Sequence, residues 1–352
     1  MEELSAYQLQ NLLDSAQSIG GDELSAYQWF SSPDGSVHIV KRLHVGTFHP
    51  FLEFRLRLRK RYSAKLAREA KKCRTLDHEH IVKLFVPSQI PECCTTITQL
   101  HPNGNLLDWR RNLTYIDLQS LCIVIQNIFI GLTYLHSNGY VHGNIRENCL
   151  LFKTEQPDSV SIVFDTSIRS ELLKLCAPSP MMEDYCPPEM VNTLLWFRNN
   201  GTVLQSGMRT LSELEQMDEL LKPTKELDVW CVGVIAHRLL TGQYPFDADQ
   251  VFRADSSRNN IGPNRLKHPL LRTYSPSIRR QLDLWLHANP ADRATAEIGS
   301  LSDWFSDKSC TSDKRNLLYI LEYSLVAHEL DTSGFLPQMV EQLRIGKLNG
   351  QS

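Results

Sequence analysis

The order of strand and helix signals along the chain is the strongest constraint on its fold. The N-terminal part of the sequence predicts a small sheet. Residues 24–43 contain the turn sequence Ser32-Pro33-Asp34-Gly35, after which Val37 and Ile39 alternate with polar residues. This pattern is typical of two strands joined by a tight turn.

Helical signals dominate the rest of the chain. Apolar residues recur with helical spacing over 117–139, and this segment ends in a Ser-Asn-Gly sequence typical of a helix C-terminus. A strongly apolar helix is predicted over 226–240 and two more helices over 277–305, while 149–152 and 160–164 predict short buried strands. Strands early and helices late indicate an α+β fold with two lobes, for which 352 residues suffice.

Composition excludes several classes of protein. Lys plus Arg is 37 and Asp plus Glu is 40, so a formal charge of −3 excludes bulk binding of polyanions. Nine cysteines without a Cys-x-x-Cys pair exclude a disulfide scaffold or zinc ribbon, and they indicate a reducing compartment. No apolar run reaches the ~18 residues of a membrane span. We therefore expect a cytoplasmic or nuclear protein without a membrane span.

One strongly basic segment, residues 55–74, departs from this balance. It carries ten Lys or Arg and a single acid, Glu69. The simpler interpretation is a solvated helix face whose long stems cover apolar surface. The alternative is a dock for an acidic peptide, a phosphate, a membrane or a nucleic acid. Since no aromatic stacking platform accompanies the charges, we expect no DNA or RNA binding.

Five segments resemble, in order, the motifs of the eukaryotic protein kinase family. Each is weak alone, but five in family order at near-family spacing indicate the fold. The segments are Leu135–His142 (LHSNGYVH), Tyr185–Glu189 (YCPPE), Asp228–Gly233 (DVWCVG), Leu239–Phe246 (LLTGQYPF) and Asn289–Arg293 (NPADR). The Thr-Gly-x-x-Pro-Phe sequence and Arg146 are more similar to serine/threonine than to tyrosine kinases.

The resemblance implies a bilobal fold with a small, mostly-β N-lobe and a larger, mostly-α C-lobe. It divides the chain into a helical lead, a kinase-like domain and a helical tail. The expected bounds are 1–18 for the lead, 19–306 for the domain (N-lobe 19–98, hinge 99–104, C-lobe 105–306) and 307–352 for the tail. An insertion at about 191–224 is longer than the family usually has, and it is either a surface loop or a partner-binding element.

The resemblance also implies a nucleotide site in the N-lobe. Lys41 matches the phosphate-pairing lysine, Glu69 its partner in the following helix, and Thr98 the gatekeeper. Of the glycine-rich loop only Gly20 remains, and Asp22 and Ser25 replace the other two glycines. Ile39 replaces the small alanine that covers the adenine. Leu150 is the remaining residue that the resemblance assigns to nucleotide binding.

The catalytic loop departs from the family pattern His-Arg-Asp-x-Lys-x-x-Asn. It begins at His142, and Asn144 replaces the aspartate that accepts the substrate proton. An amide has no useful basicity at pH 7, whereas a positioned base is worth about 10²–10⁴ in rate. Arg146 keeps the charge of the family lysine. Without a gap Cys149 occupies the metal-binding position, and with one residue deleted Asn148 does; we favour Asn148.

The metal motif Asp-Phe-Gly is altered as well. It is matched by Asp165-Thr166-Ser167, in which only the aspartate is kept. In another alignment Phe164 takes the aspartate position and no metal ligand remains. The residues that brace the family fold are kept, however: His142, Asp228, Glu189 and Arg293 all match their family counterparts.

The residues that brace the family fold are kept, whereas the residues that carry out the reaction are altered. This combination indicates a pseudokinase, a kinase-fold protein used as a scaffold or allosteric regulator in signalling. ATP binding would be weak or absent, Asp165 and Asn148 would be the residues left to hold Mg²⁺, and the partner would be another protein. The alternative is a divergent serine/threonine kinase of low activity that transfers the ATP γ-phosphate to a protein. A nucleic-acid module based on the basic segment ranks below both.

Overall fold

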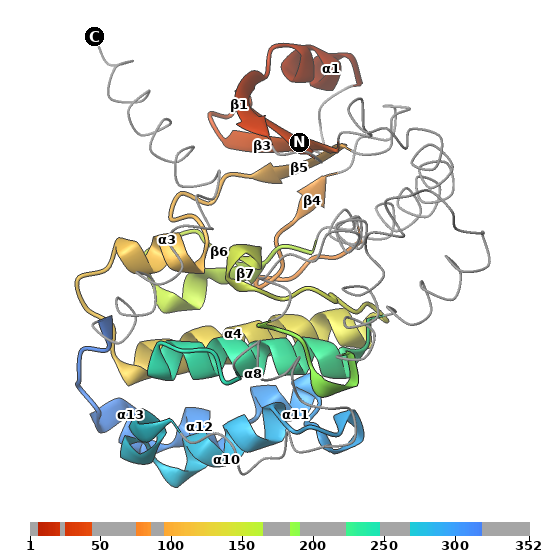
Figure 1. Cartoon of the computed structure of the whole chain (residues 1–352). Coiled ribbons are helices and arrows are strands. Elements are labelled where there is room, and N and C mark those ends of the chain that lie inside the picture. Colours follow the sequence, from red (N-terminus) through yellow and green to blue (C-terminus); the bar gives the residue numbers. More distant parts are fainter. Residues whose placement is uncertain are drawn as a thin grey trace, which may run out of the picture.

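The structure is a computed structural model, described for residues 6–21, 25–43, 75–85, 95–164, 184–190, 223–246 and 268–318. Figure 1 shows a sheet-containing lobe built mainly from the N-terminal part of the chain above a larger helical lobe. This is the predicted α+β, bilobal architecture. Glu69, Asp165, the rest of the basic segment 55–74 and residues 191–222 of the insertion lie outside the described residues.

The N-lobe contains a five-stranded antiparallel sheet in the order β1-β2-β3-β5-β4. Its strands are β1 (Gln17–Gly21), β2 (Ser25–Ser31), β3 (Val37–Leu43), β4 (Leu84–Phe85) and β5 (Thr95–Gln99). The strands predicted within 24–43 are thus confirmed as β2 and β3. Their turn closes with the Gly35 amide donating to the Ser32 carbonyl at 2.8 Å, and Gly35 adopts a φ of 79°.

Helix α1 (Ala6–Asp14) covers the face of this sheet that points away from the helical lobe (Figure 1). Leu9 and Leu13 pack there against Phe30, Val40 and Ile97, which form a small core of their own. Alternation along each strand leaves the opposite face for residues such as Ile39. The segment predicted as a separate lead is therefore packed on the sheet, and β1 spans the predicted boundary at residue 18.

The C-lobe is built around two long helices, α4 (Leu118–Ser137) and α8 (Lys225–Thr241), which pack against each other. Both confirm helices predicted from the sequence. The other elements are α3 (Leu106–Arg111), η1 (Glu147–Cys149), β6 (Leu150–Phe152), η2 (Pro157–Ser159), β7 (Val160–Ile162), η5 (Pro269–Thr273), α10 (Pro276–Trp285), η6 (Pro290–Asp292), α11 (Ala296–Ser300), α12 (Asp303–Ser306) and α13 (Lys308–Ser312).

Helix α4 is a core helix with well-defined ends, and it leads into the catalytic loop. Asp117 caps its start by accepting from the Ser120 amide at 2.9 Å, and Gly139, just past its end, has a φ of 78° that favours glycine. Gly131 lets the His80 carbonyl approach, since a Cβ there would lie 2.9 Å from that oxygen. By length and composition α4 could cross a membrane, but 61% of its apolar 18-residue window is buried inside the protein, as expected of a core helix.

The C-lobe core contains a buried histidine that makes the stability of the protein depend on pH. The Nδ1 atom of His237 in α8 donates to the Gln243 carbonyl at 2.8 Å, and burial lowers the pKa of this imidazole to about 4. Between pH 6.5 and 4 the unfolded state therefore binds more protons than the folded state. Stability must fall as the pH decreases through this window.

We predict that His237→Asn, which keeps a donor for the Gln243 carbonyl but cannot titrate, weakens this pH dependence. The wild type should lose about 2 kcal/mol of unfolding free energy through this histidine between pH 7 and pH 5. The variant should lose correspondingly less. Urea denaturation at the two pH values measures the difference, and an equal loss in both proteins would show that His237 does not contribute.

Candidate functional site

Four of the residues predicted to bind a nucleotide lie on paired strands of the N-lobe sheet: Gly20, Ile39, Lys41 and Thr98. Ile39 of β3 is directly paired with Thr98 of β5, and both side chains are half-buried. One step along the sheet, Lys41 is paired with Tyr27 of β2, and Tyr27 in turn with Gly20 of β1. The pairing thus brings these predicted residues to one face. Tyr27 and Ile39 contribute an aromatic ring and a β-branched side chain to the face of the sheet opposite α1.

The catalytic loop is held by one buried carboxylate. Asp228, in the first turn of α8, has no exposed surface. Its Oδ1 accepts from the Gly143 amide at 2.7 Å, and its Oδ2 accepts from the His142 amide and from Nε2 of His136, each at 2.8 Å. All three donors converge on one charge, so the loop backbone is fixed to the core. Gly143 adopts a φ of 76°, and its Cβ would lie 2.6 Å from Pro223.

The reacting positions of the loop lie just after this brace. Asn144 is half-buried, and its backbone amide donates to Nδ1 of His142 at 3.2 Å. Its carbonyl accepts from the Cys149 thiol at 3.3 Å. The structure places an amide side chain where the resemblance puts the catalytic base.

Asn148 and Cys149, the two candidates for the second metal ligand, are neighbours at the start of β6. Cys149 is buried, and its carbonyl accepts from the Val163 amide at 2.8 Å as β6 begins. Asn148 is exposed, and its Oδ1 accepts from the Cys149 thiol at 3.4 Å. Of the two residues that could match the metal-binding position, Cys149 is thus buried and Asn148 is exposed. Leu150, the remaining predicted nucleotide residue, is fully buried in β6 and paired with Ile162.

Of the predicted metal ligands, Asp165 lies outside the described residues and Asn148 is exposed. Mg²⁺ prefers hard oxygen ligands in octahedral geometry, and a thiol is a poor substitute. Within the described part of the chain no group of three or more His, Cys, Asp or Glu could hold a metal ion. Phe164, the alternative match to the metal aspartate, is buried and lies 5.9 Å from the His142 ring, centroid to centroid.

A buried ionic network, which the sequence analysis missed, lies directly behind the loop. Glu147 accepts from Arg238 of α8 at 2.6 Å and from the Tyr185 hydroxyl, while Arg238 also stacks over the Tyr244 ring at 4.6 Å. Burial alone would raise the pKa of Glu147, but the Arg238 charge and the Tyr185 hydroxyl hold it below its usual value. The network ties the loop, the 184–190 segment and α8 together. The sequence held one signal of this network, the charged Arg238 in a strongly apolar helix, because a buried arginine requires a partner.

The second brace is the pair Glu189–Arg293. Both guanidinium nitrogens Nη1 and Nη2 of Arg293 donate to the Glu189 carboxylate at 2.9 Å, a two-bond fork. Arg293 also stacks over the Trp230 ring at 4.9 Å and donates to the Glu226 carbonyl at 2.9 Å. The pair therefore links the 184–190 segment to the helices below it. The Arg293 side chain of the pair is buried, whereas Glu189 lies at the surface.

Comparison with known proteins gives a family for this geometry. The family model described as protein tyrosine and serine/threonine kinase matches residues 55–194. Calcium/calmodulin-dependent protein kinase type II of Caenorhabditis briggsae is 27% identical over 247 residues, which are 69% of this chain and 41% of that protein. The meiosis-specific serine/threonine-protein kinase MEK1 of Saccharomyces cerevisiae is 30% identical over 214 residues, 58% of this chain and 40% of that protein.

A solved structure shares the fold. The crystal structure of Rad53 1-466 in complex with AMP-PNP superposes with a TM-score of 0.55 at 18% identity, covering 83% of this chain and 65% of that chain. The family model and the relatives support the eukaryotic protein kinase superfamily, and the chain has the bilobal kinase fold. It spans about two fifths of the length of the two curated relatives.

The Asp228 brace gives a prediction about stability. Asp228→Asn replaces one acceptor oxygen with a donor, so at least one buried N–H loses its partner. We expect a loss of about 3 kcal/mol of unfolding free energy and faster hydrogen exchange at the His142 and Gly143 amides. Asp283→Asn in α10 is the matched control, because burial already raises the pKa of that carboxyl and neutralising it should cost little. A loss below about 1 kcal/mol in Asp228→Asn would contradict the brace.

Proposed function

We propose that this chain is a pseudokinase, which acts as a scaffold or allosteric regulator for another protein in signalling. The observation that carries the proposal is the catalytic loop. Its backbone is fixed to Asp228, yet Asn144 supplies an amide at the base position and Cys149 a thiol at the metal position. Without a base and a second metal ligand the loop cannot support efficient phosphoryl transfer.

The sheet face supports weak nucleotide binding at most. Ile39 stands where the family has the small alanine, beside Thr98. Additional methylene groups in a tight site cost about 1–3 kcal/mol. Tyr27 adds an aromatic ring on the same face, paired with Lys41. We propose that these side chains restrict the adenine site, and that the protein acts in the cytoplasm or nucleus on a protein partner.

The second candidate is a low-activity serine/threonine kinase. The relatives favour this candidate, since their names are those of serine/threonine-protein kinases and calcium/calmodulin-dependent kinases. Positioning and electrostatics carry most of phosphoryl transfer, so Lys41 and Arg146 would have to act without the aspartate base. This reading requires that restoring the base restores the rate.

Phosphorylation assays separate the two candidates. We predict that the wild type, with Mg²⁺ and ATP, phosphorylates itself and added protein no faster than Lys41→Met. Asn144→Asp should also remain at this level, because Cys149 still occupies the metal position. Asn112→Asp, an exposed position at the end of α3, is the matched control.

Either of two results would overturn the proposal. Sustained phosphorylation by the wild type that Lys41→Met abolishes would establish a kinase. A rise of about 100-fold or more in Asn144→Asp, the smallest effect expected of a positioned base, would establish that only the base is missing.

A further inference from the structure

The carboxylates of Glu147 and Asp228 at the catalytic loop already have partners within the protein. The Glu147 carboxylate is paired with Arg238 at 2.6 Å and also accepts from the Tyr185 hydroxyl. The Asp228 carboxylate accepts from two backbone amides and from His136. Asn144 is neutral where an active kinase has an aspartate. The described carboxylates of the loop thus already have hydrogen-bond donors within the protein.

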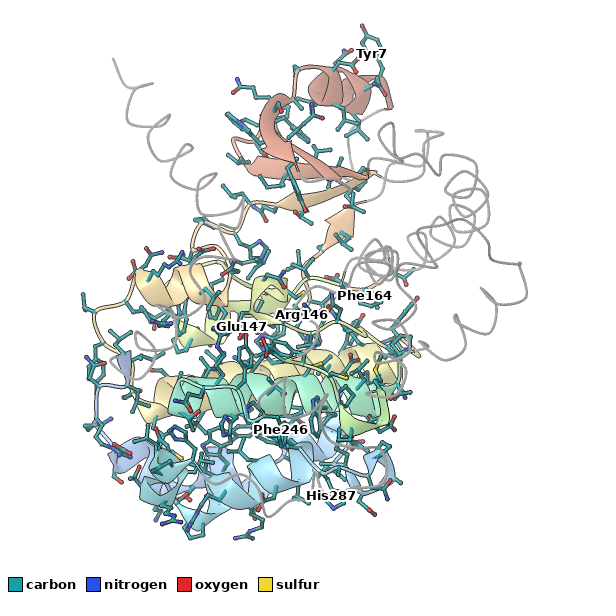
Figure 2. All side chains as sticks on the ribbon, viewed as in Figure 1. Tyr7, Arg146, Glu147, Phe164, Phe246 and His287 are labelled. Carbon is teal, nitrogen blue, oxygen red and sulfur yellow. The ribbon has the colours of Figure 1, made fainter. Side chains whose placement is uncertain are left out.

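Arg146 remains as a positive charge at this place. Its guanidinium stacks over the Tyr185 ring, with Cζ 5.5 Å from the ring centroid, and the side chain is only half-buried. Among the residues that the structure describes, no carboxylate or carbonyl accepts a hydrogen bond from this guanidinium. Figure 2 shows Arg146 in the part of the C-lobe nearest the sheet, in the same region as Glu147 and Phe164. Stacking uses the flat face of the group and leaves its edge, which carries the N–H donors, available.

The platform under Arg146 is rigid. Tyr185 donates its hydroxyl to Glu147, its ring lies edge-on to Tyr244 at 5.7 Å, and it is buried. Burial and the Glu147 charge raise the pKa of the Tyr185 hydroxyl well above its usual value, so the donor stays protonated. A guanidinium held on a fixed ring loses little conformational freedom when it binds a ligand.

We propose that Arg146, stacked on Tyr185, binds the phosphate of a phosphorylated serine or threonine in a protein partner. The planar guanidinium edge matches two phosphate oxygens, and the phosphate carries about −1.5 to −2 charges at pH 7. The inference deepens the proposed function and rests on it, because a loop that does not transfer phosphate is free to bind the phosphorylated side chain. The terminal phosphate of a nucleotide has the same chemistry and is the competing source.

Titration calorimetry on the full chain tests the proposal. The probe is an alanine pentapeptide with a central phosphoserine, compared with its unphosphorylated twin, inorganic phosphate and ATP. We expect the phosphopeptide to bind at least tenfold more tightly than the twin and more tightly than inorganic phosphate. Arg146→Lys, which keeps the charge but not the fork, should weaken binding several-fold, and Arg146→Ala should reduce it to the level of the twin.

Controls keep a negative result meaningful. Arg272→Ala, at an exposed position in η5, removes an arginine elsewhere and should leave binding unchanged. Urea denaturation checks that each variant is folded. Equal binding of the phosphopeptide and its twin, or full binding by folded Arg146→Ala, would overturn the inference. ATP binding through Arg146 more tightly than the phosphopeptide would assign the site to a nucleotide instead.

The two proposals fail separately. Phosphoryl transfer by the wild type would overturn the proposed function whatever the calorimetry gives. Loss of the phosphopeptide preference without any phosphoryl transfer would overturn only the assignment of Arg146.

Discussion

The carboxylate of Asp228 fixes the backbone from which every loop residue is presented. It lies at the start of α8, without exposed surface, and receives the amides of His142 and Gly143 together with the imidazole of His136. One charge thereby joins the ends of the two central helices to the loop. A buried carboxylate is tolerated only when its lone pairs are filled, and here three donors fill them. The loop geometry is therefore a property of the C-lobe core and does not require catalysis to maintain it.

Around this brace the chain combines retained architecture with altered chemistry. The Glu189–Arg293 fork fixes the 184–190 segment to the helices of the C-lobe. The Tyr185 hydroxyl fixes the same segment to the loop by donating to Glu147, which Arg238 of α8 also binds. Asn144 and Cys149 change the groups that would act on a phosphate without disturbing either pair. A surface of this kind is well suited to binding, because the protein itself has already paid the ordering entropy.

The sequence allowed prediction of those features that depend on local pattern. Turn chemistry placed the β2–β3 hairpin, helical periodicity placed α4 and α8, and family motifs pointed to Asp228 and to the Glu189–Arg293 pair. Contacts between distant positions were not predictable. Glu147 and Arg238 lie 91 positions apart in no shared motif, and the docking of α1 on the sheet depends on a three-dimensional match of Leu13 with Val40 and Ile97. The burial of Cys149 and the exposure of Asn148 could not be predicted from spacing either, because they depend on how the loop packs before β6.

We propose that the catalytic loop is structurally intact but lacks its metal chemistry. Titration calorimetry of ATP with Mg²⁺ and with EDTA tests it most directly. Since Cys149 fills the inner position and Asn148 is exposed, we predict that any ATP affinity is the same within about twofold in both conditions, a difference of about 0.4 kcal/mol. ATP binding that is tenfold or more tighter with Mg²⁺ would contradict the account, because it would require a working metal site.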